Sequence, residues 1–178
     1  EKTDYTEQLR RSGAGTVADP YVYAVSRTSI SFYEGNVRAK DATGLALVKQ
    51  ETYKDALSAD EISGVDTTID NRKLSIAYFK GEENDEKTDY TEQLKSNGID
   101  VSRTSVSFYG DGTKRAQDAT GLALHHQDTY QGKITFAADG SIPSSQKKLS
   151  VAYFKGEEGD EKTDYTEQLR RSGAGTVA

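Results

Sequence analysis

The chain opens with EKTDYTEQLRRSGAGTVA (residues 1–18), and the same stretch returns unchanged as residues 161–178. Its first part, EKTDYTEQL, also occurs at 86–94, where it continues as KSNGIDVSRT. The sequence therefore divides into a long repeat (1–85), a short repeat (86–160) and the start of another long repeat. Such recurrence predicts an alternating array of similar structural units.

Two pairs of matching segments predict β-strands. SRTSISFY at 26–33 and SRTSVSFY at 102–109 alternate polar and apolar residues, the period of a half-buried strand. KLSIAYFKG at 73–81 and KLSVAYFKG at 148–156 are apolar on both faces, which is typical of a central or covered strand.

The connections carry turn signals. DATGLAL, at 41–47 and 118–124, places a turn at Thr-Gly and a third strand after it. In the short repeat, Asp139-Gly140 stands between apolar residues and predicts a hairpin. In the long repeat, Ser58 followed by Glu61 predicts one short capped helical turn.

EKTDYTEQL fits two structures. Asp4 as the N-cap, Glu7 three residues later and Tyr5 one turn from Leu9 indicate a short helix. As a strand, the segment would put Tyr5, Glu7 and Leu9 on one face and bury a carboxylate. We therefore expect one to two turns of helix here.

The expected fold is mainly β, with two small antiparallel β-sandwich-like units of five or six short strands each. Apolar residues make up only 34% of the chain, so each core should be thin. We expect residues 1–18 to be the tail of a preceding unit, 19–98 the long unit and 99–175 the short unit. The charged segments at 81–89 and 156–164 are the competing boundaries.

Composition narrows the function classes. The net charge is −6 with both signs mixed along the chain, which disfavours nucleic-acid binding. No apolar run approaches the roughly 18 residues that cross a bilayer, so no membrane insertion is expected in this segment. The chain has no Met and starts at Glu, and we interpret it as a piece of a longer protein.

No motif in the sequence points to catalysis. There is no Cys, and neither GxGxxG nor GxxxxGK[ST] occurs. The two histidines, His125 and His126, are adjacent and are expected on opposite faces of a strand, which suits neither a shared metal nor a general base. We expect no enzyme activity and no bound cofactor other than calcium.

Two clusters of acidic residues are candidates for binding Ca²⁺, which takes six to eight oxygen ligands. The candidate metal ligands are Glu82, Glu83 and Asp85, with their copies Glu157, Glu158 and Asp160. The alternative is a solvated charged turn, because the spacing departs from the DxDxDG pattern and Lys80 and Lys87 partly neutralise the cluster.

The 11 tyrosines, in a chain without Trp, suggest either stacking platforms for sugars or amphipathic residues at the edge of the core. Most recur at matched positions, for example Tyr33 with Tyr109 and Tyr53 with Tyr130. Such recurrence favours the core interpretation.

These observations predict a structural protein: a repeat segment of a long extracellular fibre, surface-layer, matrix or adhesin-stalk protein. Its partners would be copies of itself or neighbouring repeats, and it would act by reach and self-association. The alternative is a pair of tandem carbohydrate- or calcium-binding β modules. Binding to glycans or calcium would favour the alternative, and end-to-end polymers would favour the structural function.

Overall fold

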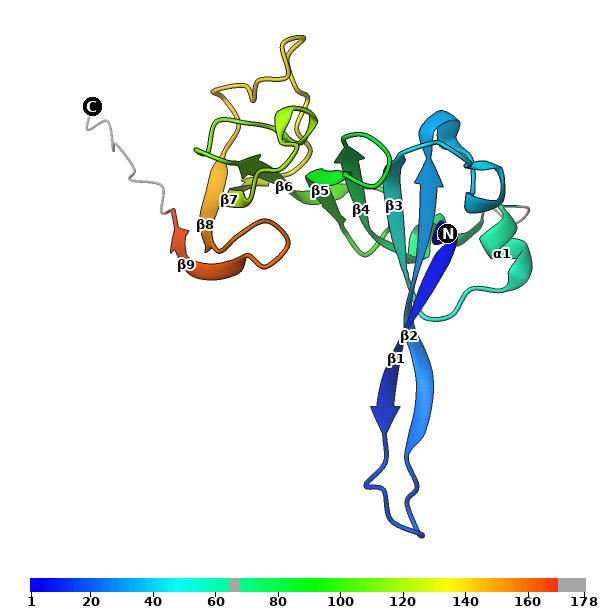
Figure 1. Ribbon diagram of the computed structural model, residues 1–178. Coiled ribbons are helices and arrows are strands. Elements are labelled where there is room, and N and C mark those ends of the chain that lie inside the picture. The colour runs from blue at the N-terminus through cyan, green and yellow to red at the C-terminus, as the bar shows by residue number, and fades with distance from the viewer. Residues whose placement is uncertain (65–67, 170–178) are drawn as a thin grey trace.

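The computed structural model describes residues 1–64 and 68–169. These residues form one antiparallel sheet of nine strands, in which each strand pairs with its neighbours in sequence order (Figure 1). The strands are β1 (Tyr5–Ser12), β2 (Val22–Tyr33), β3 (Leu47–Lys54), β4 (Lys73–Lys80), β5 (Lys87–Leu94), β6 (Val101–Tyr109), β7 (Leu124–Gln131), β8 (Lys148–Lys155) and β9 (Lys162–Gln168).

The mainly β prediction is confirmed, but the two expected sandwiches are not present. β1–β4 and β5–β8 are equivalent four-stranded units, and β9 is the counterpart of β1 and β5. The β4–β5 ladder joins the two units into a single open sheet.

One face of the sheet, here called the core face, carries buried carboxylates beside its aliphatic side chains. This composition explains why no second sheet packs on it. Residues paired across neighbouring strands alternate between aliphatic and acidic, once across β2–β5 and again across β6–β9. The two rows are Ile30, Glu51, Ile76 and Glu92, then Val106, Asp128, Val151 and Glu167. Glu51, Glu92 and Asp128 are only 8%, 3% and 3% exposed. An apolar second sheet would leave such carboxylates without partners, at a large cost in free energy.

Tyr and Lys side chains form hydrogen bonds and ion pairs with these carboxylates. Tyr53 donates a hydrogen bond of 2.5 Å to Glu51, and Lys73 lies 3.1 Å from the same carboxylate. In the second unit Tyr130 donates to Asp128 at 3.0 Å, and Lys148 lies 2.5 Å away. The two units therefore stabilise their buried carboxylates with Tyr and Lys residues at matched positions.

Loops between strands cover the core face. In the first unit Leu57 and Ile69 pack on Ile30 and Tyr53, together with Ile62 of helix α1 (Ala59–Ser63). The short helix has the predicted capping box of Ser58 and Glu61, which is confirmed by both reciprocal hydrogen bonds.

The second unit uses a different loop on the same face. Ile134, Phe136 and Ile142 pack around Val106 and Tyr130. The predicted Asp139-Gly140 turn is present, since the Ala137 amide donates to the Ser141 carbonyl, but no strands flank it. Those flanking residues bury their side chains on the sheet rather than pairing with each other.

Four short 3₁₀ helices also lie in the loops: η1 (Glu34–Asn36), η2 (Ala39–Asp41), η3 (Thr68–Arg72) and η4 (Ala116–Asp118). In the second unit, Ala116 and Ala119 pack with Tyr109, Leu122 and Leu124 at one end of the strands. This cluster holds the β6–β7 loop next to the start of β5, where the contacts described below are made.

The opposite face, here called the hydroxyl face, carries small polar side chains. One register row crosses eight strands without a charged or large apolar residue: Ser31, Gln50, Ala77, Thr91, Ser105, Thr129, Ser150 and Gln168. Within it, Ser105 and Thr129 share a hydrogen bond of 3.0 Å, as Ser29 and Thr52 do at 2.9 Å in the next row.

The expected helix in EKTDYTEQL is wrong: all three copies are strands. A strand does bury the glutamate of the interior copy: Glu92 is buried, and its carboxylate accepts a hydrogen bond of 3.4 Å from Tyr78 on β4.

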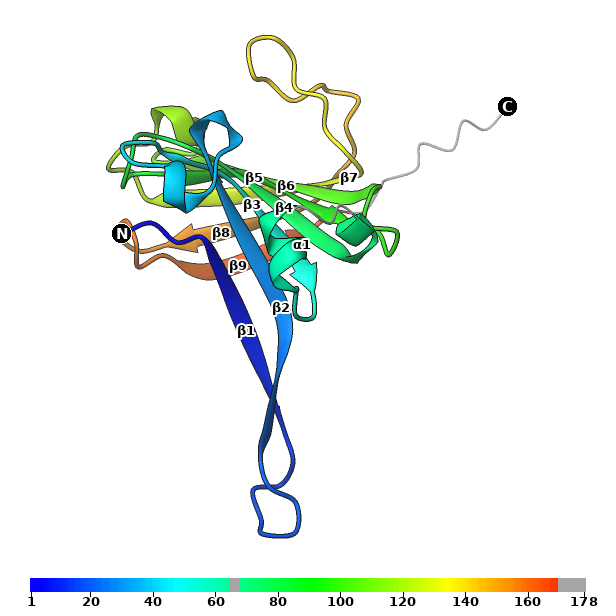
Figure 2. The same ribbon diagram turned by 90° about the vertical axis from the view of Figure 1, so that its right-hand side faces the viewer.

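The outer part of the β1–β2 hairpin projects away from the rest of the molecule (Figure 2). None of the helices in the described part of the chain is long and apolar enough to cross a membrane.

Candidate self-association interface

The three copies of EKTDYTEQL occupy three different positions in the sheet. β5 lies in the interior, between β4 and β6, whereas β1 and β9 lie at the two edges. The interior copy therefore shows which contacts a complete junction between units makes.

Toward the unit that follows it, the interior copy is held by side chains from the β6–β7 region. Tyr109 donates a hydrogen bond of 2.6 Å to the Thr88 carbonyl. Arg115 contacts Asp89 through Nε at 2.9 Å and Nη2 at 2.8 Å. Both side chains of this ion pair are mostly buried, at 18% and 13% exposed.

Toward the unit that precedes it, the interior copy makes two further contacts. The Glu86 carboxylate accepts a hydrogen bond of 2.9 Å from the Leu47 amide at the start of β3. The Tyr90 ring stacks on Tyr78 of β4, with ring centroids 4.4 Å apart. The Glu86–Leu94 segment is thus shared by both units.

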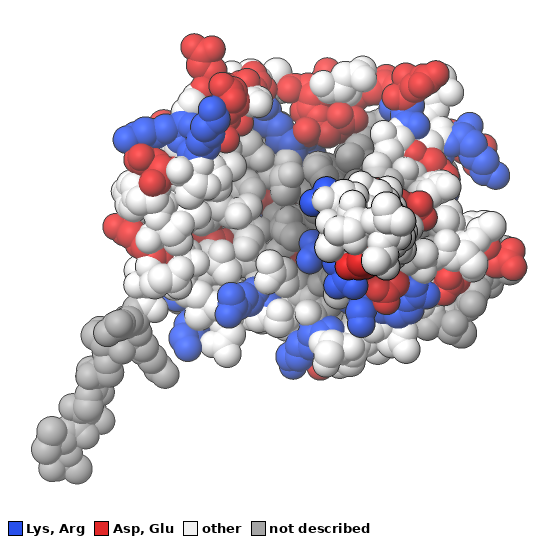
Figure 3. Space-filling model, turned by 90° about the horizontal axis from the view of Figure 1, so that it is seen from below, with Lys and Arg blue, Asp and Glu red and all other residues white. Residues whose placement is uncertain are grey.

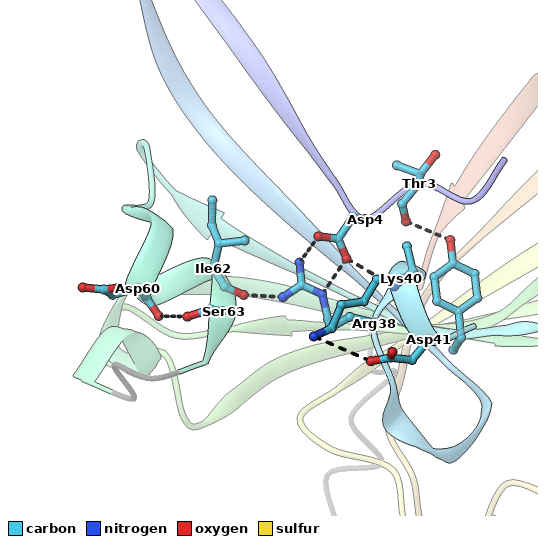
Figure 4. A network of polar contacts seen from close by, with 10 residues as sticks. Thr3, Asp4, Arg38, Lys40, Asp41, Asp60, Ile62 and Ser63 are labelled. Carbon is cyan, nitrogen blue, oxygen red and sulfur yellow. Dashed lines mark hydrogen bonds and ion pairs between the residues drawn. The ribbon is translucent and has the colours of Figure 1, made fainter. Parts of the chain in front are cut away.

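β1 repeats the contacts toward the following unit. Tyr33 donates to the Thr3 carbonyl at 2.8 Å, and Arg38 Nε donates to Asp4 at 2.9 Å. Figure 4 shows the Arg38 guanidinium between Asp4 and the carbonyl of Ile62, to which it also donates. Lys2 reaches Glu83 at 2.8 Å.

β9 repeats the contacts toward the preceding unit. Glu161 accepts a hydrogen bond of 2.8 Å from the Leu124 amide, and Tyr165 stacks on Tyr153 at 4.6 Å. Although burial opposes it, the amides around Glu161 lower the pKa of this carboxyl. Asp164, which corresponds to Asp89, pairs with Lys155 at 2.8 Å and has no arginine partner among residues 1–64 and 68–169.

The two edges are therefore complementary halves of one junction. Side chains that are half-buried in β5 are more exposed at the edges: Tyr5 is 45% and Leu9 62% exposed in β1, and Tyr165 is 49% exposed in β9. The sequence patterns did not reveal Arg38 and Arg115 as partners of this segment. Their shared position three residues before Asp-Ala-Thr-Gly was the available signal.

Protonation states at the buried carboxylates follow from their partners. Although burial opposes it, hydrogen bonds from Tyr53 and Lys49 and the charge of Lys73 hold the pKa of Glu51 below its ordinary value. Burial, followed by the charge of Glu92, raises the pKa of Tyr78 to about 12. Burial, followed by the hydrogen bond to Glu51, also raises the pKa of Tyr53. Both Tyr53 and Tyr78 therefore remain neutral donors near neutral pH.

The acidic candidates for calcium binding lie in the β4–β5 and β8–β9 turns, where lysines contact several of them. Glu83 pairs with Lys2, and Glu158 pairs with Lys87, which also lies 3.9 Å from Asp85. In the described part of the chain, no three or more His, Cys, Asp or Glu side chains are grouped to hold a metal ion.

The two histidines are closer together than the strand alternation predicts. The Nδ1 atoms of His125 and His126 lie 3.0 Å apart, next to an irregularity in the β6–β7 register. His126 stacks on Phe108 at 4.6 Å between ring centroids, and burial lowers the pKa of its imidazole. The ring is thus part of the core face.

The hydroxyl face holds two matched cavities, of about 260 and 310 Å³. Six positions are common to both linings: Arg27/Arg103, Thr52/Thr129, Leu74/Leu149, Ser75/Ser150, Gln93/Gln168 and Leu94/Leu169. Neither lining includes a tyrosine. Four of the recurrent tyrosines (Tyr33, Tyr53, Tyr109 and Tyr130) are buried, as the core interpretation predicts.

Charges of both signs are interspersed over the side of the molecule seen in Figure 3, without one continuous basic surface. No protein-family model, curated protein or solved structure matches this chain.

Proposed function

We propose that this chain is a structural repeat segment of an extracellular fibre, surface layer, matrix or adhesin stalk, acting by reach and self-association. The observation that carries the proposal is the difference between the three copies of EKTDYTEQL. β5 is paired on both sides, whereas β1 and β9 each have one edge without a partner strand among residues 1–64 and 68–169. Each edge offers one half of the contacts that the interior junction makes.

Unpaired strand edges are templates for pairing with other chains. Directly after β9, the Leu169 amide donates inward to the Leu149 carbonyl. Because donors alternate between the two sides of an antiparallel strand, the amide of Thr166 faces the open edge. The Thr166 amide can therefore donate a hydrogen bond to an incoming strand, because it takes no part in the β8–β9 ladder.

The test uses that amide. Thr166→Pro removes the outward donor and keeps the β8–β9 ladder, and Thr166→Ala keeps the donor as the matched control. We expect the parent and Thr166→Ala to associate with rising concentration in light scattering and to form elongated assemblies in negative-stain images. Thr166→Pro should associate much less. A parent chain that stays monomeric throughout, or a proline variant that assembles equally, would refute the proposal.

A second candidate function, carbohydrate binding, is favoured by the matched cavities on the hydroxyl face. Each combines one arginine with Gln, Thr and Ser side chains, which suit the hydroxyl and carboxylate groups of an acidic saccharide. Arg27→Ala and Arg103→Ala should each weaken binding on a glycan array that contains acidic sugars. Absence of binding by the parent chain would exclude this function for the sugars tested.

A further inference from the structure

We infer that copies of this chain join by strand exchange: β9 of one copy takes the place of β1 beside β2 of a second copy. The inference rests on the proposed self-association and names its partner, register and displaced strand. Residues 161–169, which include β9, have the same sequence as residues 1–9. Whatever surface of β2 accepts β1 therefore accepts β9.

Register supports the exchange on both sides of the inserted strand. β9 already pairs with β8 as β5 pairs with β4, with Tyr165 opposite Tyr153 as Tyr90 is opposite Tyr78. β1 pairs with β2 in the register by which β5 pairs with β6, with Tyr5 opposite Ile30 and Tyr90 opposite Val106. The exchanged joint would place Tyr165 opposite Ile30 of the second copy.

Side chains at the joint are also complementary. In the second copy, Arg38, Tyr33 and Glu83 now hold Asp4, the Thr3 carbonyl and Lys2. The equivalents in β9 are Asp164, the Thr163 carbonyl and Lys162. Each would gain the partner that its counterpart in β5 has, and the new joint would reproduce the interior junction.

The energetic balance explains when exchange occurs. Over the pairs from Tyr5 to Leu9, exchange replaces one set of residues by the same residues. It also frees β1 of the receiving copy, whose recovered chain entropy offsets the lost freedom of the two molecules. The resident β1 competes as a tethered strand, with an effective concentration of about millimolar. Exchange should therefore be weak in dilute solution and extensive at about 1 mM protein.

Cysteine cross-linking of full-length chains tests the register, because the chain has no cysteine of its own. Gln8 lies opposite Arg27 in the β1–β2 ladder, so Gln168 would lie opposite Arg27 of the second copy. One chain carries Gln168→Cys and the other Arg27→Cys, mixed at about 1 mM and oxidised. A single chain with Gln8→Cys and Arg27→Cys is the positive control and should close internally.

Thr166→Cys mixed with Arg27→Cys is the off-register control, since two residues of slippage move the Cα atoms beyond disulfide distance. We expect the Gln168–Arg27 heterodimer to exceed this control about tenfold. Excess synthetic peptide EKTDYTEQL should suppress it. Equal yields for both pairs, resistance to the peptide, or no heterodimer while the positive control closes would overturn the exchange.

The two proposals fail differently. Assemblies that depend on the Thr166 amide but give no Gln168–Arg27 cross-link would refute exchange and leave edge-to-edge association standing, with β1 retained at the joint. A parent chain that gives neither assemblies nor cross-link would refute both.

Discussion

One residue position allows the junction to be tested by stability alone. Asp4, Asp89 and Asp164 hold the same place in three identical segments, and Asp→Asn removes the charge from each while keeping its size. Asp89 and its partner Arg115 are 13% and 18% exposed. Asp4 is 45% exposed, and Asp164 and its partner Lys155 are 36% and 79% exposed.

Burial sets the expected order of the three effects. Breaking a buried ion pair costs about 3–5 kcal/mol, and an exposed pair contributes about 0–1 kcal/mol. Asp89→Asn should therefore lower the free energy of unfolding by about 2–3 kcal/mol, because its pair is mostly but not fully buried. The expected losses are about 1 kcal/mol for Asp4→Asn and under about 0.5 kcal/mol for Asp164→Asn.

Urea unfolding followed by far-ultraviolet circular dichroism measures the series, in dilute protein where association does not contribute. The slopes of free energy against urea must agree between variants for the comparison to hold. If Asp164→Asn destabilises the chain as much as Asp89→Asn, the difference between interior and edge copies is refuted. A loss below about 0.5 kcal/mol for Asp89→Asn would show that the Arg115 contact does not hold the junction.

Three further predictions use single side chains. Glu51 has a depressed pKa in the folded state, so its stabilising effect is present above pH 4.5 and lost as the pH falls through the folded pKa; Glu51→Gln should flatten this acid limb in unfolding experiments across pH. Tyr109→Phe removes one hydrogen bond to β5 and should cost about 1 kcal/mol in urea unfolding. Gly98→Ala should destabilise far more than Gly140→Ala in thermal unfolding: both have positive φ, but only at Gly98 would a Cβ meet a backbone oxygen, at 1.8 Å.

The parts of the fold predicted from sequence are those set by local pattern. Alternation in SRTSISFY and the apolar run in KLSIAYFKG gave the strands β2 and β4 and their copies. Ser58 and Glu61 gave the capping box, because both partners lie within one helical turn. None of these features depends on a residue far away in the chain.

The parts that failed depend on distant partners. EKTDYTEQL was expected to be helical because a strand would bury Glu, and the partner that makes this burial tolerable, Tyr78, lies on another strand. The sandwich was expected because apolar residues alternate on the strands. The carboxylates of Glu51 and Asp128 lie among them on the same face, where Tyr and Lys residues of the neighbouring strand positions pair with them. Loops, not a second sheet, cover that face.

The order of strands in the sheet has a consequence for synthesis of the chain. Each strand pairs only with the strands directly before and after it in sequence, and no strand is inserted later between two earlier ones. A polypeptide that emerges N-terminus first can therefore add every new strand to an edge that is already formed. Local pairing of this kind keeps contact order low for a β protein and favours rapid folding. Each repeat would be complete as soon as the next EKTDYTEQL segment leaves the ribosome.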